Sequence, residues 1–550
     1  MGCKFRSLIL ACGLVSLGSW GAMAQETILV NGIEATRVVI GPAISPLAKI
    51  IKTGLREDYY GAKSGTRTWE NAQSLYYFYG ARNFEPLWLE KSTDQVAFSS
   101  KAQAVIDLFK NAEFEGLRTT DYLTGKLDIA GAQGDPQKLA LVEVAFTDAA
   151  ILYAQHAASG RIAPSAVSRS ISLRPTQVDL AKLRIDLVSS NNPAALLQSM
   201  HPTHPEFLGL RAELSKRIAG PEIEQIIVPD GKLIKLGFSD QRLPILRQRL
   251  DLTLVDASKE LVYDAQVEEA VKKFQTSIGI NGDGVVGPAT VAALNGAQGA
   301  SVEDIVANME RWRWMPKDLG DFNVFVNIPE YRLQVVKSGI VQHETRVVVG
   351  KPEFKTPIFS DEIEHVVVNP YWNVPSSIAT NELLPSAIGN PNYFESKNYE
   401  LLAGGKVINA SSIDWANVNI KKPPFRIRQR PGRDNALGSI KFLFPNKHAV
   451  YLHDTPSKSL FNSSRRAYSH GCVRVQNPLE FADALLRYEP SLSLEKIKGM
   501  MGKNEKWNNL KNKIPVHLAY FTLRIDADGT VRSFGDVYGH NTKLKALLKG

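Results

Sequence analysis

Apolar residues recur three and four positions apart across much of residues 66–230, a spacing that predicts amphipathic helices. The clearest runs are residues 102–109 and 139–158. Gly and Pro interrupt the pattern at 159–164 and close it near 219–221. These features predict an all-helical domain over residues 66–230. Residues 25–65 mix short β-rich pieces with Gly and Pro, and are predicted to form an extended N-terminal segment.

Residues 231–297 are predicted to form a compact three-helix domain. Amphipathic runs at 243–250 and 267–275 are followed by a glycine-rich turn at 279–288. Pro288 suits the first turn of a short final helix that reaches Leu294. Residues 298–321 are interpreted as a connector whose aromatic residues include Trp312 and Trp314.

From residue 322 the pattern changes to short β-branched runs bounded by turns, at 324–328, 332–336, 344–349 and 365–368. They predict a β-rich domain over residues 322–540, with a final hairpin of 516–525 and 531–537, followed by a basic tail at 541–550. Between about 376 and 435 the strand pattern is lost. So long a stretch inside a compact domain is usually functional, and we interpret it as a lid over a cleft. A decorative insertion is the alternative. The expected fold class is multidomain α+β.

The length agrees with several domains, because 550 residues exceed what one hydrophobic core usually supports. Lys4 and Arg6 precede an apolar run at 8–20 that closes with Ala22-Met23-Ala24, which predicts a signal peptide over residues 1–24. We therefore expect export to the periplasm. Export argues against nucleic acid as the partner of a chain with formal charge +9. The charge indicates either a solvated basic surface or attraction to an acidic cell-wall substrate.

Cysteine usage directs attention to one residue. Cys3 and Cys12 lie within the predicted signal peptide, so Cys472 is the single cysteine expected in the mature chain. A lone thiol in an oxidising compartment is either buried and inert or retained for chemistry. A thiol of pKa about 8.5 is mostly protonated at neutral pH, and it becomes a nucleophile beside an imidazole, a positive charge or a helix N-terminus.

The sequence around Cys472 offers all three. His453 follows an apolar run and precedes a turn, which places its ring at a domain edge as a candidate base. The backbone N–H groups of Gly471 and Cys472 would form an oxyanion hole, with His470 as a second donor. A helix is predicted to begin just after this segment, with a capping box formed by Asn477, Pro478 and Glu480.

Arg474 would hold a substrate carboxylate or favour the thiolate. Each residue also has an ordinary interpretation: a packed cysteine, surface or core histidines, a salt-bridged Arg474, and Ser469 as a turn residue. Metal binding by the two histidines and the cysteine is disfavoured, because a structural zinc site needs four ligands and no CxxC or HExxH pattern is present. Neither a metal nor a cofactor is expected.

Two motifs resemble known families. His453 followed by Ser469-His470-Gly471-Cys472 resembles the signature of the L,D-transpeptidase family with its YkuD-type catalytic domain. Residues 274–290, with Phe-Gln near the start and Asp-Gly-Val-Val-Gly-Pro near the end, resemble the three-helix peptidoglycan-binding module. A spacer that has lost binding is the alternative for this module. The order of helical scaffold, module and catalytic domain with a lid is similar to the YcbB-like subgroup.

The resemblance implies that Cys472 attacks the diaminopimelate carbonyl of a tetrapeptide stem, expels D-alanine and leaves a thioester. The diaminopimelate amine of a second stem then takes the acyl group, which gives a 3→3 cross-link. His453 would move the protons, oriented by a carbonyl or hydroxyl at the Asp454 position. The expected substrate-binding residues are Arg474, Ser469, Tyr451, Tyr371, Trp372 and Asn435.

Other outcomes stay open at this point. The same thioester could pass to an envelope protein or to water, which would make the protein an anchoring enzyme or a carboxypeptidase. A catalytically inactive wall-binding scaffold is a third possibility. The expected partners are peptidoglycan stem peptides, and other cell-wall enzymes or envelope proteins are left open. A covalent carbapenem adduct on Cys472 would separate an enzyme from a scaffold.

Overall fold

The structure is a computed structural model. It describes residues 27–550 except 31–32, 37–39, 64–65, 93–94, 221–225, 278–281, 297–299, 389, 391, 416 and 527. The predicted signal peptide, residues 1–24, lies outside the described residues. Among the helices that are described, none combines the length and the apolar character that crossing a membrane requires.

The chain divides into two compact units, and the division cuts through the predicted scaffold domain. The first unit comprises the described residues up to Gln103, with Gly125–Asp148 and Ala181–Ser189. The second comprises Ala104–Thr124, Ala149–Leu180 and Ser190–Gly550. Helices α3 (Ser100–Lys110), α4 (Pro136–Ser159) and α6 (Leu180–Ser189) contribute residues to both units.

The first unit corrects two predictions. Residues 46–61 form helix α1 (Pro46–Gly61) rather than extended chain, because Ser45 caps the helix and Pro46 fits its first turn. The predicted all-helical domain contains a hairpin in addition to helix α2 (Arg67–Gly80). Its strands are β3 (Leu89–Ser92) and β4 (Gln95–Phe98), and a further hairpin pairs β1 (Thr27–Val30) with β2 (Ile33–Thr36). Buried Glu143 on α4 accepts the N–H groups of Leu87 and Leu89, which fixes the chain at the entry to β3.

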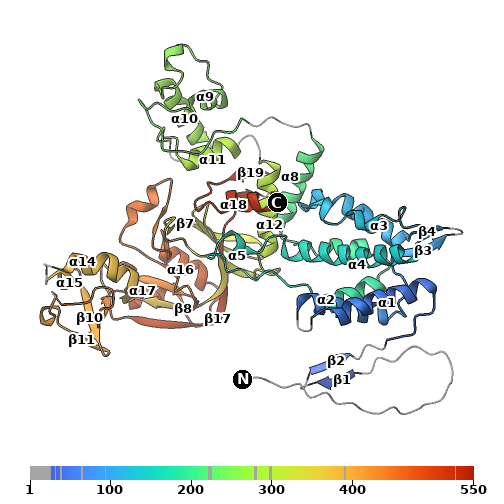
Figure 1. The fold of residues 1–550 in the computed structure, drawn as a ribbon. Coiled ribbons are helices and arrows are strands. Elements are labelled where there is room, and N and C mark those ends of the chain that lie inside the picture. The colour runs from blue at the N-terminus through green and yellow to red at the C-terminus, as the bar shows by residue number, and fades with distance from the viewer. Residues whose placement is uncertain are drawn as a thin grey trace. The chain divides into compact units, whose positions relative to one another are not determined.

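The second unit begins with short helices and the three-helix module. The helices before the module are α5 (Pro164–Val167), α7 (Pro193–Gln198) and α8 (Pro205–Ala219). The module contains α9 (Leu243–Arg249), α10 (Ala265–Ser277) and α11 (Pro288–Gly296) (Figure 1). Buried Gln275 on α10 donates to the Asp283 carboxylate at 2.9 Å and accepts the Gly284 N–H at 2.8 Å. This explains why the glutamine and the Asp-Gly pair recur together in the motif.

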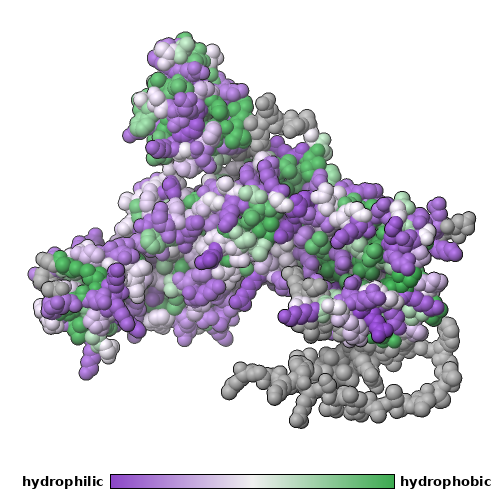
Figure 2. Space-filling model, in the orientation of Figure 1, coloured by the Kyte–Doolittle hydropathy of each residue, from purple (hydrophilic) through white to green (hydrophobic). Residues whose placement is uncertain are grey.

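The surface of the module carries apolar side chains. Figure 2 shows hydrophobic residues exposed among hydrophilic ones on it. The exposed apolar residues in this part of the chain include Leu233, Leu236, Phe238, Leu254 and Val255.

The predicted connector is a helix that packs into the core of the β-rich domain. Helix α12 (Val302–Trp314) is capped by Ser301, whose hydroxyl accepts the N–H of Asp304. Trp314 belongs to the large core of the β-rich domain, and Trp312 to a neighbouring core that contains Phe325 and Phe521.

The β-rich domain is a nine-stranded mixed sheet in the order β15-β7-β16-β14-β13-β8-β17-β5-β6, with an additional β6–β7 pairing that closes the sheet on itself. Its strands are β5 (Phe322–Asn327), β6 (Arg332–Lys337), β7 (Ile340–Gly350), β8 (Phe359–Val368), β13 (Ile440–Leu443), β14 (Leu452–His453), β15 (Ala467–Ser469), β16 (Val473–Val475) and β17 (Lys506–Ala519). Helices α16 (Pro478–Leu486) and α17 (Leu494–Met500) pack on its core.

Three predictions in this domain need correction. Residues 516–519 belong to β17, so the hairpin consists only of β18 (Leu523–Ile525) and β19 (Val531–Ser533). The predicted basic tail is helix α18 (His540–Lys549), which buries Leu544 and Leu548. Asn477 does not cap α16 through its side chain, because its amide donates to the Glu480 carboxylate at 3.0 Å instead.

The predicted lid has a fold of its own, between β8 and β13 (orange in Figure 1). Its strands, β9 (Trp372–Asn373), β10 (Tyr399–Ala403), β11 (Lys406–Ile408) and β12 (Arg426–Gln429), form a sheet in the order β11-β10-β12-β9. Its helices are α13 (Ser376–Ile378), the π-helical turn η5 (Ala379–Leu383), α14 (Leu384–Ala387) and α15 (Tyr393–Ser396). A separate hydrophobic core includes Leu384, Phe394, Leu401 and Ile427.

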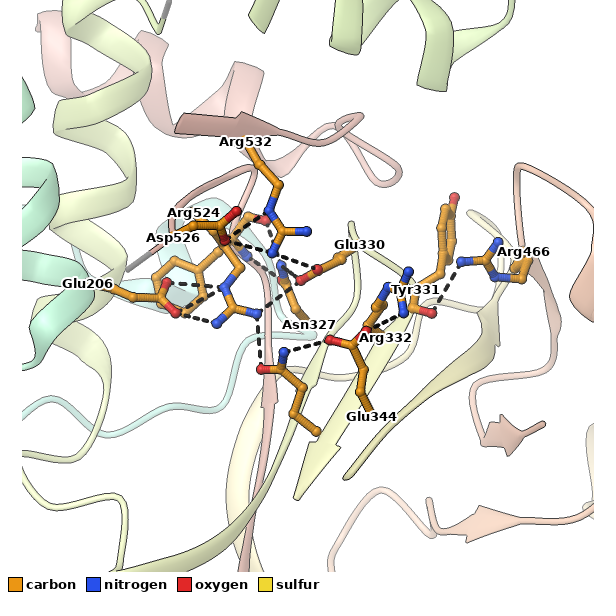
Figure 3. A network of polar contacts seen from close by, with 12 residues as sticks. Glu206, Asn327, Glu330, Tyr331, Arg332, Glu344, Arg466, Arg524, Asp526 and Arg532 are labelled. Carbon is orange, nitrogen blue, oxygen red and sulfur yellow. Dashed lines mark hydrogen bonds and ion pairs between the residues drawn. The ribbon is translucent and has the colours of Figure 1, made fainter. Parts of the chain in front are cut away.

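A polar network centred on Arg524 joins α8 to the strands of the sheet (Figure 3). The Arg524 guanidinium binds Glu206 on α8 and donates to Glu330 at 3.2 Å and to Gln334 at 3.1 Å. Arg532 pairs with the Asp526 carboxylate at 2.8 Å. The network therefore attaches the β18–β19 hairpin and α8 to the turn between β5 and β6.

Candidate active site

Three adjacent strands place three polar side chains in one row. In the sheet register His453 of β14 is the partner of Arg474 on β16 and of Lys441 on β13. Residues directly opposite one another on paired strands present their side chains on the same face. The row therefore runs Arg474, His453, Lys441 across the sheet.

Cys472 lies on the same face, two residues before Arg474. The Val473 N–H donates to the Tyr451 carbonyl at 3.1 Å, which brings the thiol beside Tyr451. The Cys472 thiol donates to the Ala449 carbonyl oxygen, with the sulfur 4.0 Å from that oxygen, and Tyr451 acts to lower the pKa of the thiol. The Tyr451 ring is 5.6 Å from the His453 ring, centroid to centroid. Among the described hydrogen bonds the thiol thus donates to the Ala449 carbonyl, and none joins it directly to the imidazole.

The environment of His453 keeps its imidazole neutral. The ring is buried, and its Nδ1–H donates to the backbone carbonyl oxygen of Asp454. This tautomer leaves Nε2 as a proton acceptor. Burial, followed by the positive charge of Arg474, lowers the pKa of His453 to about 3, and Lys441 acts in the same direction.

The Asp454 side chain faces away from this ring. Its carboxylate accepts from the Ser439 N–H at 2.9 Å and from the Lys458 ammonium at 2.5 Å. The Asp454 backbone carbonyl, rather than its carboxylate, is therefore the group that orients His453.

The thiol of Cys472 is protonated at rest. Burial raises its pKa, while Tyr451, Arg474 and Lys441 lower it without cancelling that effect. The two cations that favour the thiolate are Arg474 on β16 and Lys441 on β13.

The loop before Cys472 is held by its own hydrogen bonds. Gly471 has φ +115°, a conformation that L side chains rarely adopt. Its N–H donates to the Ser469 hydroxyl at 3.1 Å, and that hydroxyl donates to the Cys472 carbonyl at 2.5 Å. The predicted oxyanion donor Gly471 is thus engaged, whereas the Cys472 N–H has no partner among the described hydrogen bonds. Ser469 is buried and positions this loop.

His470 points toward the lid rather than toward the thiol. Its Nε2 lies 2.7 Å from the Glu382 carboxylate in the π-helical turn η5. Its ring centroid is 4.8 Å from that of Phe354.

Among the predicted substrate-binding residues, Trp372 and Tyr371 remain candidates for the cleft, whereas Asn435 does not. The Trp372 side chain lies near Tyr451 and acts to lower the pKa of its hydroxyl, which places the base of the lid beside the residue next to the thiol. Tyr371 lies under the Arg428 guanidinium at 4.2 Å from its ring centroid. Asn435 cannot line a cleft, because it is fully buried and its amide donates to the Arg430 carbonyl at 2.9 Å and the Pro370 carbonyl at 3.1 Å. It braces the lid instead.

Two residues were missed by the sequence reasoning. Lys441 is a single cation within the apolar stretch 440–444, and this contrast was the available signal. Glu382 gave no signal, because its contact with His470 depends on how the lid folds. Among the described residues, no cluster of three or more His, Cys, Asp or Glu side chains could hold a metal ion.

Three family models match separate parts of the chain. Residues 73–214 match the family model "Scaffold domain", residues 232–294 match "Putative peptidoglycan binding domain", and residues 321–502 match "L,D-transpeptidase catalytic domain". A Haemophilus influenzae protein named "Putative L,D-transpeptidase" is 37% identical over 245 residues, which is 44% of this chain and 49% of that protein. The chain thus spans about half the length of the curated relative it matches.

Solved structures show weaker similarity. An L,D-transpeptidase from Mycobacterium smegmatis is 12% identical, covers 36% of this chain and 58% of its own, and has a TM-score of 0.17. An L,D-transpeptidase from Stackebrandtia nassauensis is 14% identical, covers 52% and 94% respectively, and has a TM-score of 0.19. TM-scores this low support no structural argument, so the family rests on the sequence matches. The chain carries a scaffold domain, a peptidoglycan-binding domain and, over residues 321–502, the L,D-transpeptidase catalytic domain of the YkuD family.

Proposed function

We propose that this protein is a peptidoglycan L,D-transpeptidase that forms 3→3 cross-links through a thioester on Cys472. The observation that carries the proposal is the arrangement of a thiol and a neutral imidazole on one face of two paired strands, inside the segment that matches the catalytic domain. A neutral imidazole with a free Nε2 is the form that can accept a thiol proton.

The first half-reaction forms the thioester. His453 Nε2 takes the proton of Cys472 as the sulfur attacks the diaminopimelate carbonyl carbon of a donor tetrapeptide. The new C–S bond gives an oxyanion, for which the Cys472 N–H is the available backbone donor. The C–N bond to the terminal D-alanine then breaks, and the leaving amine receives the proton from His453.

The second half-reaction transfers the acyl group. The side-chain amine of a second diaminopimelate attacks the thioester carbonyl and loses a proton to His453. The C–S bond breaks as the new amide forms, and the proton returns to the sulfur. A short rotation of the Cys472 side chain from the Ala449 carbonyl toward the imidazole is needed before the first half-reaction, because the resting thiol is directed at that carbonyl.

The surrounding residues are proposed to bind different parts of the donor stem. Arg474 is proposed to hold a stem carboxylate, since it makes no ion pair among the described residues. Tyr451, Trp372 and Tyr371 are proposed to line the donor site from the strand and from the base of the lid. Residues 376–435 would cover this site as a lid, held closed by the contact between Glu382 and His470.

The proposal places the protein in the periplasm, delivered by the predicted signal peptide, with stem peptides as donor and acceptor. The matched module at 232–294 would keep the enzyme on its polymeric substrate. Its exposed apolar side chains are suited to such a contact.

The test is a reaction of purified protein with disaccharide tetrapeptide, followed by mass spectrometry of the products. We expect 3→3 linked dimers and free D-alanine from the native sequence, and neither product from Cys472→Ala. Release of D-alanine without dimers would replace the transpeptidase with a carboxypeptidase. Absence of both products from the native protein would favour a wall-binding scaffold.

A further inference from the structure

Lys441 is a buried cation that the proposed mechanism does not use. It stands in β13 between Ile440 and Phe442, and only 7% of its surface is exposed. Burying an ammonium group without an acidic partner is costly, so its environment requires an explanation. No carboxylate forms a salt bridge with Lys441 among the described residues.

The neighbours of the Lys441 ammonium are aromatic rings and the active-site row. Its Nζ lies 5.8 Å from the Tyr451 ring centroid and 5.1 Å from the Trp507 ring centroid. Such cation–π contacts offset part of the desolvation cost. The negative charges that act on it are the Glu505 carboxylate and the Cys472 sulfur, and burial still lowers the pKa of Lys441 overall.

The register shows what this cation faces. Lys441 and Arg474 are the cross-strand neighbours of His453, one on each side. Tyr451, whose ring lies beside the Lys441 ammonium, is also held next to Cys472 by the hydrogen bond from the Val473 N–H to the Tyr451 carbonyl. Behind the row, Asp454 is paired with Lys458, so its charge is already compensated.

We propose that Lys441 is a positioning residue whose charge, acting with that of Arg474 across the His453 row, stabilises the thiolate of Cys472 during attack. The proposal rests on the proposed function only in taking Cys472 as the nucleophile. The same two cations repel a protonated His453. The imidazolium formed by proton transfer is therefore a strong acid, which passes its proton on to the leaving amine.

The test measures the thiol itself and needs no peptidoglycan substrate. The rate of iodoacetamide alkylation of Cys472 is followed between pH 6 and 10, by the mass of the peptide that contains this residue. Lys441→Met removes the charge and keeps much of the side-chain volume, whereas Lys441→Arg keeps the charge. Lys447→Met is the matched control, because Lys447 is an exposed lysine in the loop after β13.

We expect the midpoint of the alkylation profile to rise by about one pH unit in Lys441→Met, which slows alkylation about tenfold at pH 7. Lys441→Arg and Lys447→Met should keep the native profile. Glu505→Gln removes the negative charge nearest Lys441 and should shift the midpoint downward, which keeps the test valid should Lys441→Met fail to fold.

An unchanged midpoint in folded Lys441→Met, or in Glu505→Gln, would overturn the proposal. The result is also distinguishable from a failure of the proposed function. A shifted alkylation midpoint in a protein that makes no dimers would support the effect of Lys441 on the Cys472 thiolate and would contradict only the transpeptidase reaction.

Discussion

His453 and Cys472 are both uncharged at rest, but for different reasons. The imidazole is neutral because burial and the adjacent cations oppose a positive charge, and the Asp454 carbonyl fixes its tautomer. The thiol is neutral because burial outweighs the groups that favour its anion. The resting pair is therefore a thiol and a neutral imidazole, and in the proposed mechanism proton transfer accompanies attack instead of preceding it.

This charge state predicts an unusual pH dependence. The folded protein keeps His453 neutral down to a pKa of about 3, below the usual value for histidine. We expect the rate constant for acylation by a carbapenem to change less than about threefold between pH 5.5 and 8. A tenfold fall with a midpoint near pH 6.5 would show that His453 is not held neutral.

The free energy of unfolding should depend on pH through the protonation of the same residue, His453. An unfolded chain protonates His453 below about pH 6.5, whereas the folded chain does not do so until about pH 3. The unfolded state therefore binds more protons in this window. His453 contributes stability above pH 6.5, and this contribution is lost progressively as the pH falls toward 3.

At the residue level, the sequence identified those groups that stand within one motif. Cys472, His453 and His470 belong to two short segments with a recognisable chemical pattern. Lys441 reaches the same site only through the register of β13 with β14, which residue spacing does not reveal. Asn435 was assigned to the cleft from its position along the chain, but the fold turns its amide inward.

At the level of elements, periodicity predicted the helices of residues 102–109 and 139–158 and most strands of the sheet, whereas helices α1 and α18 and the internal fold of the lid were missed. Its strands and helical turns are too short to set up a detectable period, and its core joins residues far apart in the chain, such as Phe394 and Ile427. The sequence therefore showed an insertion but neither its sheet nor its contact with His470.

The contact between Glu382 and His470 predicts how firmly the lid is held. Glu382→Gln removes the charge of a partly exposed pair, a loss of up to about 1 kcal/mol. Hydrogen–deuterium exchange across residues 376–388 should become up to about fivefold faster. Glu395→Gln, at an exposed position on α15, is the matched control and should exchange at the native rate. Identical exchange rates in Glu382→Gln and in the native protein would contradict a role for the Glu382–His470 contact in holding the lid.

At the level of the whole molecule, each family model matches one continuous stretch of sequence, whereas each compact unit is made of separate stretches that pack together. The scaffold match at 73–214 extends over both units, because α4 is continuous through the division and α8 is bound to the sheet by Arg524. Composition shifts indicate where one pattern gives way to another. They do not indicate which helices share a core with a distant strand.

Arg524 is predicted to be a major stabilising residue of the second unit. Its neighbour Glu330 is buried and Glu206 is partly buried, and their attraction raises the pKa of Arg524 above its ordinary value. Arg524→Ala would leave these carboxylates without a partner, at a cost of about 3–5 kcal/mol in the free energy of unfolding. Urea unfolding followed by tryptophan fluorescence measures this loss. Arg532→Ala, at a half-exposed position in the same network, should cost less than about 1 kcal/mol, and equal losses would contradict the assignment.

The reactivity of one sulfur atom, that of Cys472, underlies the whole proposed activity. Intact-mass spectrometry of the protein after incubation with a carbapenem tests it most directly. We predict a single covalent adduct on the native protein that is absent from Cys472→Ala and greatly slowed in His453→Ala. No adduct on folded native protein, or an adduct that persists in Cys472→Ala, would contradict Cys472 as the nucleophile.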